Sequence, residues 1–258
     1  MSKRSFSPFC CSRIRILEIC RSLAPRRIGE KSEPSRFDFA NLVVMSSVHI
    51  IVLPGSGYQR HAPHEGEPVA QWLRTLGYEA TVLWYPVPAR HPAPLRAVED
   101  RIAEIRAEGA RTVVLLGFSA GGHLAGQAAL TLAGPGRPDA VVLAYPVVSM
   151  VTEHHAISRE NLLGQNATDE ERRSVSLELL AHRNSPPFFI WHTAEDASVP
   201  LEHSLRLADA LSDADVDFEL HVYQAGKHGV GLAEGIAGTQ DWTELCARWL
   251  SRTLQKLD

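Results

Sequence analysis

The sequence predicts an α/β fold in which a mostly parallel central sheet is flanked by helices. Strand patterns alternate with helical patterns through most of the chain, as expected when crossover helices connect parallel strands. One apolar strand, at residues 112–116, passes through the turn Gly-Phe-Ser-Ala-Gly-Gly directly into an Ala- and Leu-rich helix. The chain has 258 residues, 45% of them hydrophobic, so it can bury one large core.

The first predicted strand covers residues 48–53. A helix should follow at residues 68–76, because Pro68 suits a first helical turn and Gly77 can end the helix. Residues 80–85 are predicted as the second strand, before a proline-rich loop. The next helix is amphipathic, with four apolar residues at helical spacing: Leu95, Val98, Ile102 and Ile105.

Beyond the glycine-rich turn, the pattern predicts strands at residues 141–145, 188–192 and 218–223. A final helix has apolar residues on one face: Trp242, Leu245, Cys246, Trp249 and Leu250. We interpret its aromatic residues as core packing and not as a cofactor site. Residues 146–187 interrupt the alternation with polar and short helical pieces that replace a regular strand–helix unit.

The turn at residues 117–122 has the Gly-x-Ser-x-Gly pattern in the strand–turn–helix context of a nucleophile elbow. Glycines on both sides let the chain reverse sharply, with Ser119 in a strained conformation at the positive end of a helix. A serine hydroxyl is a poor nucleophile unless a base removes its proton. In this architecture, an acid and then a histidine should follow later in the chain.

The sequence supplies both partners in the expected order. Asp196 lies in the loop that leaves the strand at residues 188–192, and we expect it to be the acid. Glu195 is the alternative acid, and a turn or helix-capping role for Asp196 stays open. His228 follows the strand at residues 218–223 and lies between glycines, so it is the expected base.

Two other histidines near these motifs receive different interpretations. His192 lies inside a predicted strand and is interpreted as structural. His123 directly follows the glycine-rich turn and could line the site, but a helix-packing role is favoured.

Acyl transfer also needs donors for the negative charge that develops on the carbonyl oxygen. One donor should be the backbone amide of Ala120, next to the serine. The second should come from the loop after the first strand, from Gly55, Ser56 or Gly57. An ordinary glycine turn is the alternative for this loop.

These motifs together resemble a known family. The segments PGSGY at 54–58, HEGEP at 64–68 and GFSAGGHLA at 117–125 are similar to bacterial α/β-hydrolases related to acetyl-xylan and feruloyl esterases, a group that is itself related to dienelactone hydrolases. Residues 192–200 and 226–229 fit the same group. Two departures concern the surroundings of the site: Ser56 stands where relatives usually have glycine, and Pro86 where they tend to have arginine.

The resemblance implies an α/β-hydrolase fold and a serine esterase that acts through an acyl-enzyme. It favours short acyl groups, acetyl first, on sugars or xylo-oligosaccharides. A peptidase of the prolyl-oligopeptidase type shares the elbow but usually carries an additional large domain. A non-catalytic binding protein on this fold would typically lack one of the three residues, and a dienelactone-hydrolase-like activity would prefer cysteine at position 119.

The same architecture gives residues 146–187 two interpretations. The stretch is either a small cap over the active site or a surface excursion, and both stay open. If it is a cap, His154 and His155 would form a polar rim for the alcohol part of an ester.

Composition disfavours several classes of partner, and the resemblance implies a small-molecule ester substrate. The net charge of −4 gives no reason to expect nucleic acid or an anionic membrane surface, and no apolar run is long enough to span a bilayer. The chain has no His-x-x-x-His helix and no paired cysteines after residue 45, so neither a metal nor another cofactor is expected. Cys246 alone forms no disulfide framework, which suits the cytoplasm. The sequence leaves the oligomeric state open.

Residues 1–45 differ from the rest of the chain. They contain nine basic and four acidic residues, a net charge of +5, which leaves −9 for the remainder, and they hold three of the four cysteines. Charge interrupts their apolar stretches, which disfavours a signal peptide. Our hypothesis is that this segment is disordered or absent from the native protein, with Met45 as the start and residues 46–258 as the hydrolase domain.

Overall fold

The computed structural model describes residues 47–152 and 155–257. Within them, six strands form one sheet in the order β2-β1-β3-β4-β5-β6, and every pairing in it is parallel. The strands are β1 (Val48–Leu53), β2 (Glu79–Val82), β3 (Thr112–Phe118), β4 (Ala140–Ala144), β5 (Phe188–Thr193) and β6 (Phe218–Tyr223). The predicted fold class is confirmed.

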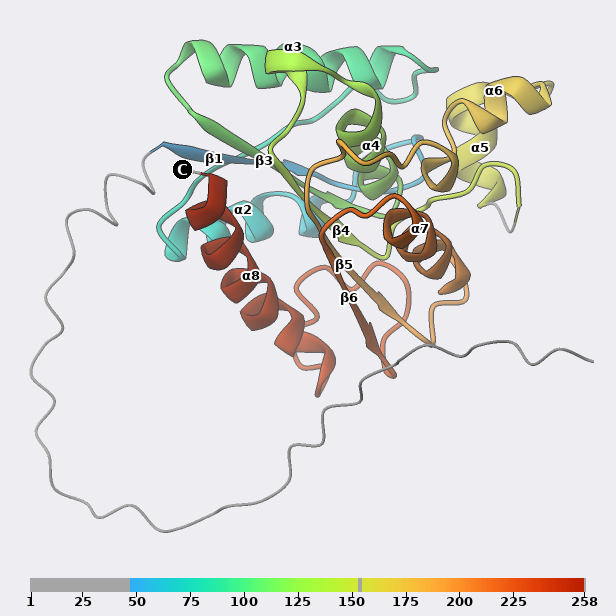
Figure 1. Ribbon diagram of the computed structural model, residues 1–258. Helices are drawn as coiled ribbons and strands as arrows, with labels where there is room; N and C mark the ends of the chain where they lie inside the picture. The colour runs from blue at the N-terminus through green and yellow to red at the C-terminus, as the bar shows by residue number, and fades with distance from the viewer. Residues whose placement is uncertain (1–46, 153–154, 258) are drawn as a thin grey trace, which may run out of the picture. The chain divides into compact units, whose positions relative to one another are not determined.

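Helices cover both faces of this sheet (Figure 1). On one face lie α3 (Ala93–Ala107), α4 (Ser119–Thr131) and α7 (Glu202–Asp213), which bury their apolar residues in one core cluster. On the other face, α2 (Glu67–Thr75) and α8 (Trp242–Leu257) pack into a second cluster. The sheet therefore separates two hydrophobic cores.

Strand β3 shows why the sheet is a rigid support. All seven of its residues are buried, and successive side chains enter opposite cores: Val113 and Leu115 join one cluster, Val114 and Leu116 the other. Each such side chain contributes roughly 1.5–3 kcal/mol when fully buried. Loops at the carboxyl end of the sheet are thus held on a well-packed scaffold.

Several boundaries differ by one or two residues from the sequence-based expectation, and β2 differs most. Strand β2 ends at Val82 and not at residue 85. Trp84 is half exposed, whereas Tyr85 is buried and donates its hydroxyl hydrogen to the Pro54 carbonyl. The last residues of the apolar run thus leave the ladder to support the loop after β1. Helix α2 begins one residue early, which puts Pro68 in its first turn.

The stretch between β4 and β5 contains two short helices, α5 (Ala156–Leu163) and α6 (Asp169–Arg173), and adds no strand to the described sheet. Thr168 and Glu171 form a reciprocal capping box at the start of α6. The expectations about residues 1–45, Met45 and His154 lie outside the described residues.

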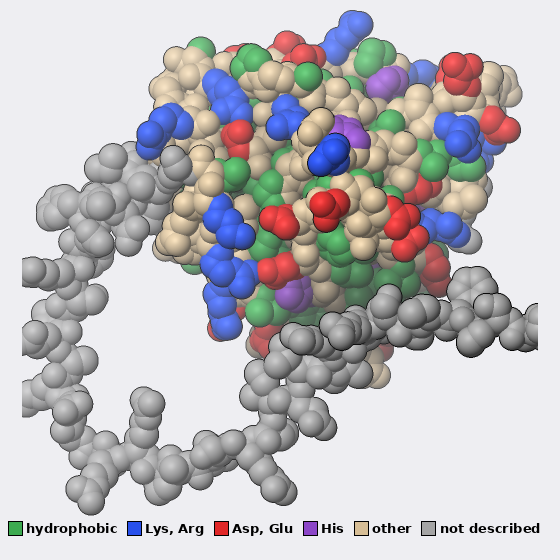
Figure 2. All heavy atoms as spheres, viewed as in Figure 1, with side chains coloured by type: hydrophobic (Ala, Val, Ile, Leu, Met, Phe, Trp, Pro, Cys, Tyr) green, Lys and Arg blue, Asp and Glu red, His purple; other side chains and the backbone are tan. Residues whose placement is uncertain are grey.

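Charged side chains of both signs occur across the face drawn in Figure 2, among apolar and uncharged side chains. Among residues 47–152 and 155–257, no helix combines the length and the apolar character needed to cross a membrane.

Candidate active site

Ser119 opens α4 in the conformation that the elbow motif predicts. Its φ angle is 51°, in the left-handed region that side-chain-bearing residues rarely adopt, and the residue is 3% exposed. The neighbouring glycines are required by close approaches of backbone. A Cβ atom on Gly117 would lie 2.3 Å from the Gly121 carbonyl oxygen, and one on Gly121 would lie 2.1 Å from that of Leu53.

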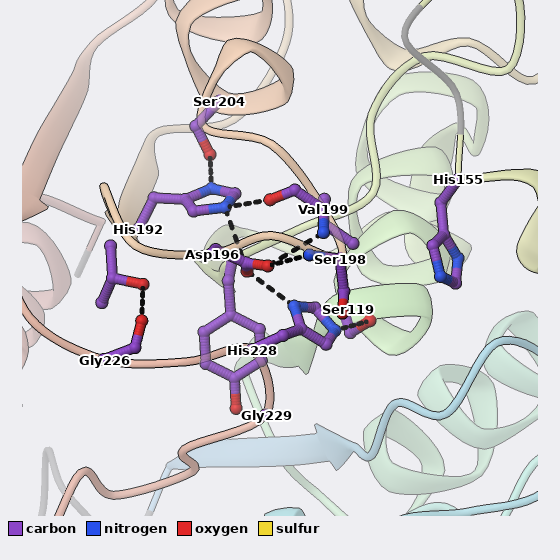
Figure 3. A network of polar contacts seen from close by, with 12 residues as sticks. Ser119, His155, His192, Asp196, Ser198, Val199, Ser204, Gly226, His228 and Gly229 are labelled. Carbon is purple, nitrogen blue, oxygen red and sulfur yellow. Dashed lines mark hydrogen bonds and ion pairs between the residues drawn. The ribbon is translucent and has the colours of Figure 1, made fainter.

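The structure brings together Ser119 from the start of α4, Asp196 from the turn after β5 and His228 from the segment after β6 (Figure 3). The Ser119 hydroxyl lies 2.8 Å from His228 Nε2, and His228 Nδ1 lies 2.6 Å from Asp196 Oδ2. A proton on Nδ1 bonds to the carboxylate, which leaves Nε2 free to accept the serine proton. The imidazole is 21% exposed and the carboxylate is completely buried.

Asp196 is stabilised as an ionised carboxylate. Its Oδ1 accepts hydrogen bonds of 2.9 Å from the amides of Ser198 and Val199. Burial alone would raise the pKa of Asp196. Hydrogen bonds from His192 and His228, the charge of His228 and the Val199 amide outweigh burial and hold the pKa below its usual range.

His192 supports this carboxylate directly, a contact that the structural interpretation of its sequence position missed. Its buried ring donates through Nε2 to the Val199 carbonyl, 2.8 Å away, and Nδ1 accepts from the Ser204 hydroxyl. The same Nε2 lies 3.4 Å from Asp196 Oδ2. No sequence signal separates this histidine from an ordinary strand residue, because its contacts depend on how the turn after β5 and the start of α7 fold back over the strand.

Glu195, the alternative acid, bonds elsewhere. Its Oε2 accepts a hydrogen bond of 3.1 Å from the Gly226 amide, and the Thr193 hydroxyl donates to the Gly226 carbonyl. Both residues thus hold the start of the segment at residues 226–231, called the His228 loop below. Asp196, and not Glu195, is the carboxylate in contact with the imidazole.

The loop after β1, residues 54–58 and called the β1 loop below, has consecutive residues at positive φ: Ser56 at 111°, Gly57 at 68° and Tyr58 at 59°. It passes so close to the serine that a Cβ atom on Gly55 would lie 2.8 Å from Ser119 Cβ. The Ala120 amide lies in the first turn of α4, where amides have no partner within the helix.

One expected oxyanion donor needs correction. The Gly55 amide donates a hydrogen bond of 2.8 Å to Glu65 Oε2, so in this structure it is directed at a side chain and not at the site. Ser56 and Gly57 remain as the expected donors from this loop. Glu65 belongs to the segment at residues 64–68, but nothing in that pattern separates it from Glu67, which pairs with Arg74 on the surface.

His123 holds the β1 loop in place through Tyr58. Its Nδ1 accepts a 2.7 Å hydrogen bond from the Tyr58 hydroxyl, and its Nε2 donates to the Val175 carbonyl, also 2.7 Å away. The ring is fully buried, and burial lowers its pKa to about 4, although the Val175 carbonyl acts in the opposite direction. His123 is therefore a neutral packing residue, as the favoured interpretation held.

Helix α5 and the residue before it border the same loop. The Asn161 side chain donates a 2.8 Å hydrogen bond to the Gly57 carbonyl. Ile157 is 55% exposed, and its Cγ2 would lie 3.0 Å from a Cβ atom on Gly57. The His155 ring lies nearly parallel to that of His228, with the ring centroids 6.5 Å apart.

Comparisons with known proteins place the chain among esterases and related hydrolases by similarity. The endo-1,4-β-xylanase B of Butyrivibrio fibrisolvens is 37% identical over 207 residues, 71% of this chain and 32% of that protein. An acetylxylan esterase of Xylanibacter ruminicola is 29% identical over 198 residues, 71% of this chain and 41% of the relative. The chain thus spans less than half the length of either relative.

Two solved structures have the same fold. The acetyl ester-xyloside bifunctional hydrolase of Caldicellulosiruptor lactoaceticus is 39% identical, with a TM-score of 0.76 over 80% of this chain and 83% of that one. A sugar hydrolase of Lactococcus lactis is 29% identical, with a TM-score of 0.70 over 83% and 92% of the two chains. The resemblance to acetylxylan esterases found in the sequence is confirmed.

A family model completes the comparison: residues 97–257 match the prolyl oligopeptidase family. The matched region begins in α3 and includes the elbow, the Asp196 turn and the His228 loop. The chain belongs to the prolyl oligopeptidase family and has the α/β-hydrolase fold.

Proposed function

We propose that this chain is a serine esterase that hydrolyses short-chain carboxylic esters, acetyl esters first, on sugars or xylo-oligosaccharides. The observation that carries the proposal is the continuous hydrogen-bonded chain from the Ser119 hydroxyl through His228 to the buried carboxylate of Asp196. The similarity to acetylxylan esterases supports the class of substrate.

The reaction begins when His228 Nε2 takes the Ser119 proton as the hydroxyl oxygen attacks the ester carbonyl. Asp196 stabilises the resulting imidazolium through Nδ1. The C–O bond to the alcohol then breaks, and the alcohol leaves with the proton from His228. Water attacks the acyl-enzyme by the same route, which releases the carboxylic acid and restores the serine.

The tetrahedral intermediate places negative charge on the former carbonyl oxygen. The amide of Ala120 and an amide from Ser56 or Gly57 are the proposed donors to this oxyanion. Each such donor typically accounts for a factor on the order of 10²–10³ in rate.

The segment between β4 and β5 acts in this proposal as a small cap that forms the alcohol-binding rim. His155 faces the imidazole from this segment, and its Nδ1 is held by the Ser158 hydroxyl. Joint substitution of His154 and His155 by alanine should raise KM for sugar acetates more than for p-nitrophenyl acetate. An unchanged KM for every ester would remove the rim from the proposal.

The location and extent of the enzyme are part of the same proposal. We place it in the cytoplasm, with small ester substrates and residues 46–258 as the catalytic domain. The described body contains one cysteine, Cys246, which is buried and unpaired, as suits a reducing compartment.

Hydrolysis of p-nitrophenyl esters from acetyl to octanoyl, with Ser119→Ala alongside, tests the reaction. We expect acetyl to be fastest and Ser119→Ala to lose a factor on the order of 10⁴–10⁶ in kcat. Acetylated xylo-oligosaccharides are the next substrates. Cleavage of a prolyl peptide in preference to every ester would favour the peptidase alternative, to which the family match also points. No cleavage of any substrate would favour a binding protein.

A further inference from the structure

The Glu65 side chain is a buried carboxylate next to the site that the proposed mechanism does not use. It is 2% exposed, and both of its oxygens accept hydrogen bonds. Oε2 accepts from the Gly55 amide at 2.8 Å, and Oε1 accepts from the Tyr145 hydroxyl at 2.7 Å. One carboxylate thus connects the β1 loop to the residue that follows β4.

Tyr145 extends this connection to the His228 loop. Its hydroxyl oxygen accepts a 2.9 Å hydrogen bond from the Gly231 amide, and its ring packs edge-on against His228, with the centroids 5.1 Å apart. The residue beside Glu65 makes a parallel contact: His64 Nε2 lies 2.8 Å from the Gly229 carbonyl oxygen. Two links therefore join the segment around Glu65 to the loop that carries the base.

The hydrogen positions follow from these partners. Gly231 can only donate to the Tyr145 oxygen, so the tyrosine's own hydrogen is directed to Glu65. The Gly55 amide can also only donate. Glu65 consequently accepts at both oxygens, which is the arrangement of an ionised carboxylate.

A buried negative charge is unfavourable unless it is hydrogen-bonded or paired. Burial raises the pKa of Glu65, while the bonds from Tyr145 and Gly55 and the charges of His64 and His228 act against that rise. The titratable groups that face it are two histidines and two tyrosines: His64, His228, Tyr145 and Tyr85. The carboxylate lies close to the base: its Oε1 would be 3.9 Å from a Cβ atom on Gly229, the residue after His228, and its partner Tyr145 packs on the imidazole.

We propose that Glu65 is a positioning residue for the esterase reaction, an inference that rests on the proposed function. Through Gly55 it fixes the β1 loop so that the Ser56 and Gly57 amides serve the oxyanion. Through Tyr145 it fixes the His228 loop. Its negative charge favours the imidazolium form of His228, which is the form that exists while the tetrahedral intermediate is present.

Four variants separate these effects in steady-state hydrolysis of p-nitrophenyl acetate across the pH range. Glu65→Gln keeps the shape and removes the charge, whereas Glu65→Asp keeps the charge and changes the reach. Tyr145→Phe keeps the ring packing and removes the bridging hydroxyl. Glu67→Gln is the matched control, because that exposed carboxylate lies two residues away and pairs with Arg74.

We expect Glu65→Gln to lower kcat by about 10–10²-fold with KM within about threefold of wild type, since a transition-state interaction is removed. The acid limb of its kcat/KM profile should move to lower pH, because the protonated imidazole loses a nearby negative charge. Glu65→Asp should lower kcat while it keeps the wild-type acid limb. Glu67→Gln should match wild type in both respects.

Tyr145→Phe should lower kcat, and the double variant with Glu65→Gln should lose less than the product of the two single effects. If wild type hydrolyses the ester and Glu65→Gln has the kcat and pH profile of Glu67→Gln, the inference is wrong although the proposed function stands. If Glu65→Gln does not fold, a folded Tyr145→Phe with wild-type kcat overturns it equally. A wild type without esterase activity contradicts the proposed function itself.

Discussion

The elbow and the β1 loop lie against each other at Ser119, yet they are held in place in different ways. The elbow, residues 117–121, keeps its shape through close backbone approaches within a single strand–turn–helix unit and to the end of the neighbouring strand β1. The β1 loop depends on side chains from distant parts of the chain: Glu65, Tyr85, His123 and Asn161. One half of the site is steric and local, and the other is polar and long-range.

This difference determines how each half should respond to mutation. Close-packed backbone cannot yield, so an added methyl group in the elbow should disrupt folding. A hydrogen-bonded loop has several independent anchors, so loss of one should shift geometry and activity while the fold survives.

The largest expected effect is that of Gly121→Ala. The new Cβ would lie 2.1 Å from the Leu53 carbonyl oxygen, a backbone atom that the sheet holds in place. We expect destabilisation of more than about 4 kcal/mol, seen as loss of soluble protein or a large drop in the urea midpoint. Gly126→Ala on the same helix is the control, because its Cβ meets only the flexible end of Leu177. Equal stability of the two variants would contradict a steric elbow.

The next largest effect is expected from His123, which lies in α4 shortly after the elbow and bonds Tyr58 of the β1 loop. Its pKa of about 4 lies below the ordinary histidine value of 6.5, so between these pH values the unfolded chain binds a proton that the folded state excludes. Its contribution to the free energy of unfolding should therefore fall as pH falls through this window, by up to about 3 kcal/mol.

Urea unfolding between about pH 7 and about pH 4 checks this sign. His123→Gln should be less stable at neutral pH but show a shallower loss of stability on acidification. The exposed His182→Gln should keep the wild-type slope. Identical slopes for all three proteins would show that His123 does not carry the pH dependence.

Tyr58→Phe removes one anchor of the β1 loop while the buried ring stays. The lost bond to His123 should lower stability by about 1 kcal/mol. Because the adjacent amides are the proposed oxyanion donors, kcat should fall about tenfold with little change in KM. Tyr78→Phe, at the opposite end of the sheet, is the control. A wild-type kcat in Tyr58→Phe would show that the remaining anchors suffice.

The smallest effect is expected from Ser56→Gly. Ser56 has φ of 111°, where a side chain costs about 1–3 kcal/mol, while glycine loses about 0.4–1 kcal/mol through the unfolded state. The variant should gain about 1 kcal/mol, or roughly 2–4 °C in Tm by calorimetry, with activity retained. A lower Tm would mean that the Ser56 side chain stabilises the loop more than its backbone strains it.

The same contrast explains what the sequence could predict. The elbow, Asp196 and His228 follow local patterns, namely a strand end, a glycine pair and a fixed order along the chain. The anchors do not. Glu65 and Glu67 stand two residues apart in one motif, and only Glu65 bonds the Gly55 amide. The contact of His192 with Asp196 depends on the path of the turn after β5, which no residue pattern specifies. The Gly55 amide stood among three expected oxyanion donors because nothing in the sequence indicated that Glu65 would bind it.

Two contacts of the segment between β4 and β5 support the β1 loop: Asn161 donates to the Gly57 carbonyl, and the Val175 carbonyl accepts from His123, which accepts from Tyr58. Efforts to change substrate range by exchanging this segment as a unit would thus also dismantle the support of the β1 loop. If the segment forms the alcohol-binding rim as proposed, the same two contacts serve substrate binding and catalysis. A graft that alters the rim while it preserves Asn161 and the backbone at Val175 is the design that keeps the enzyme active.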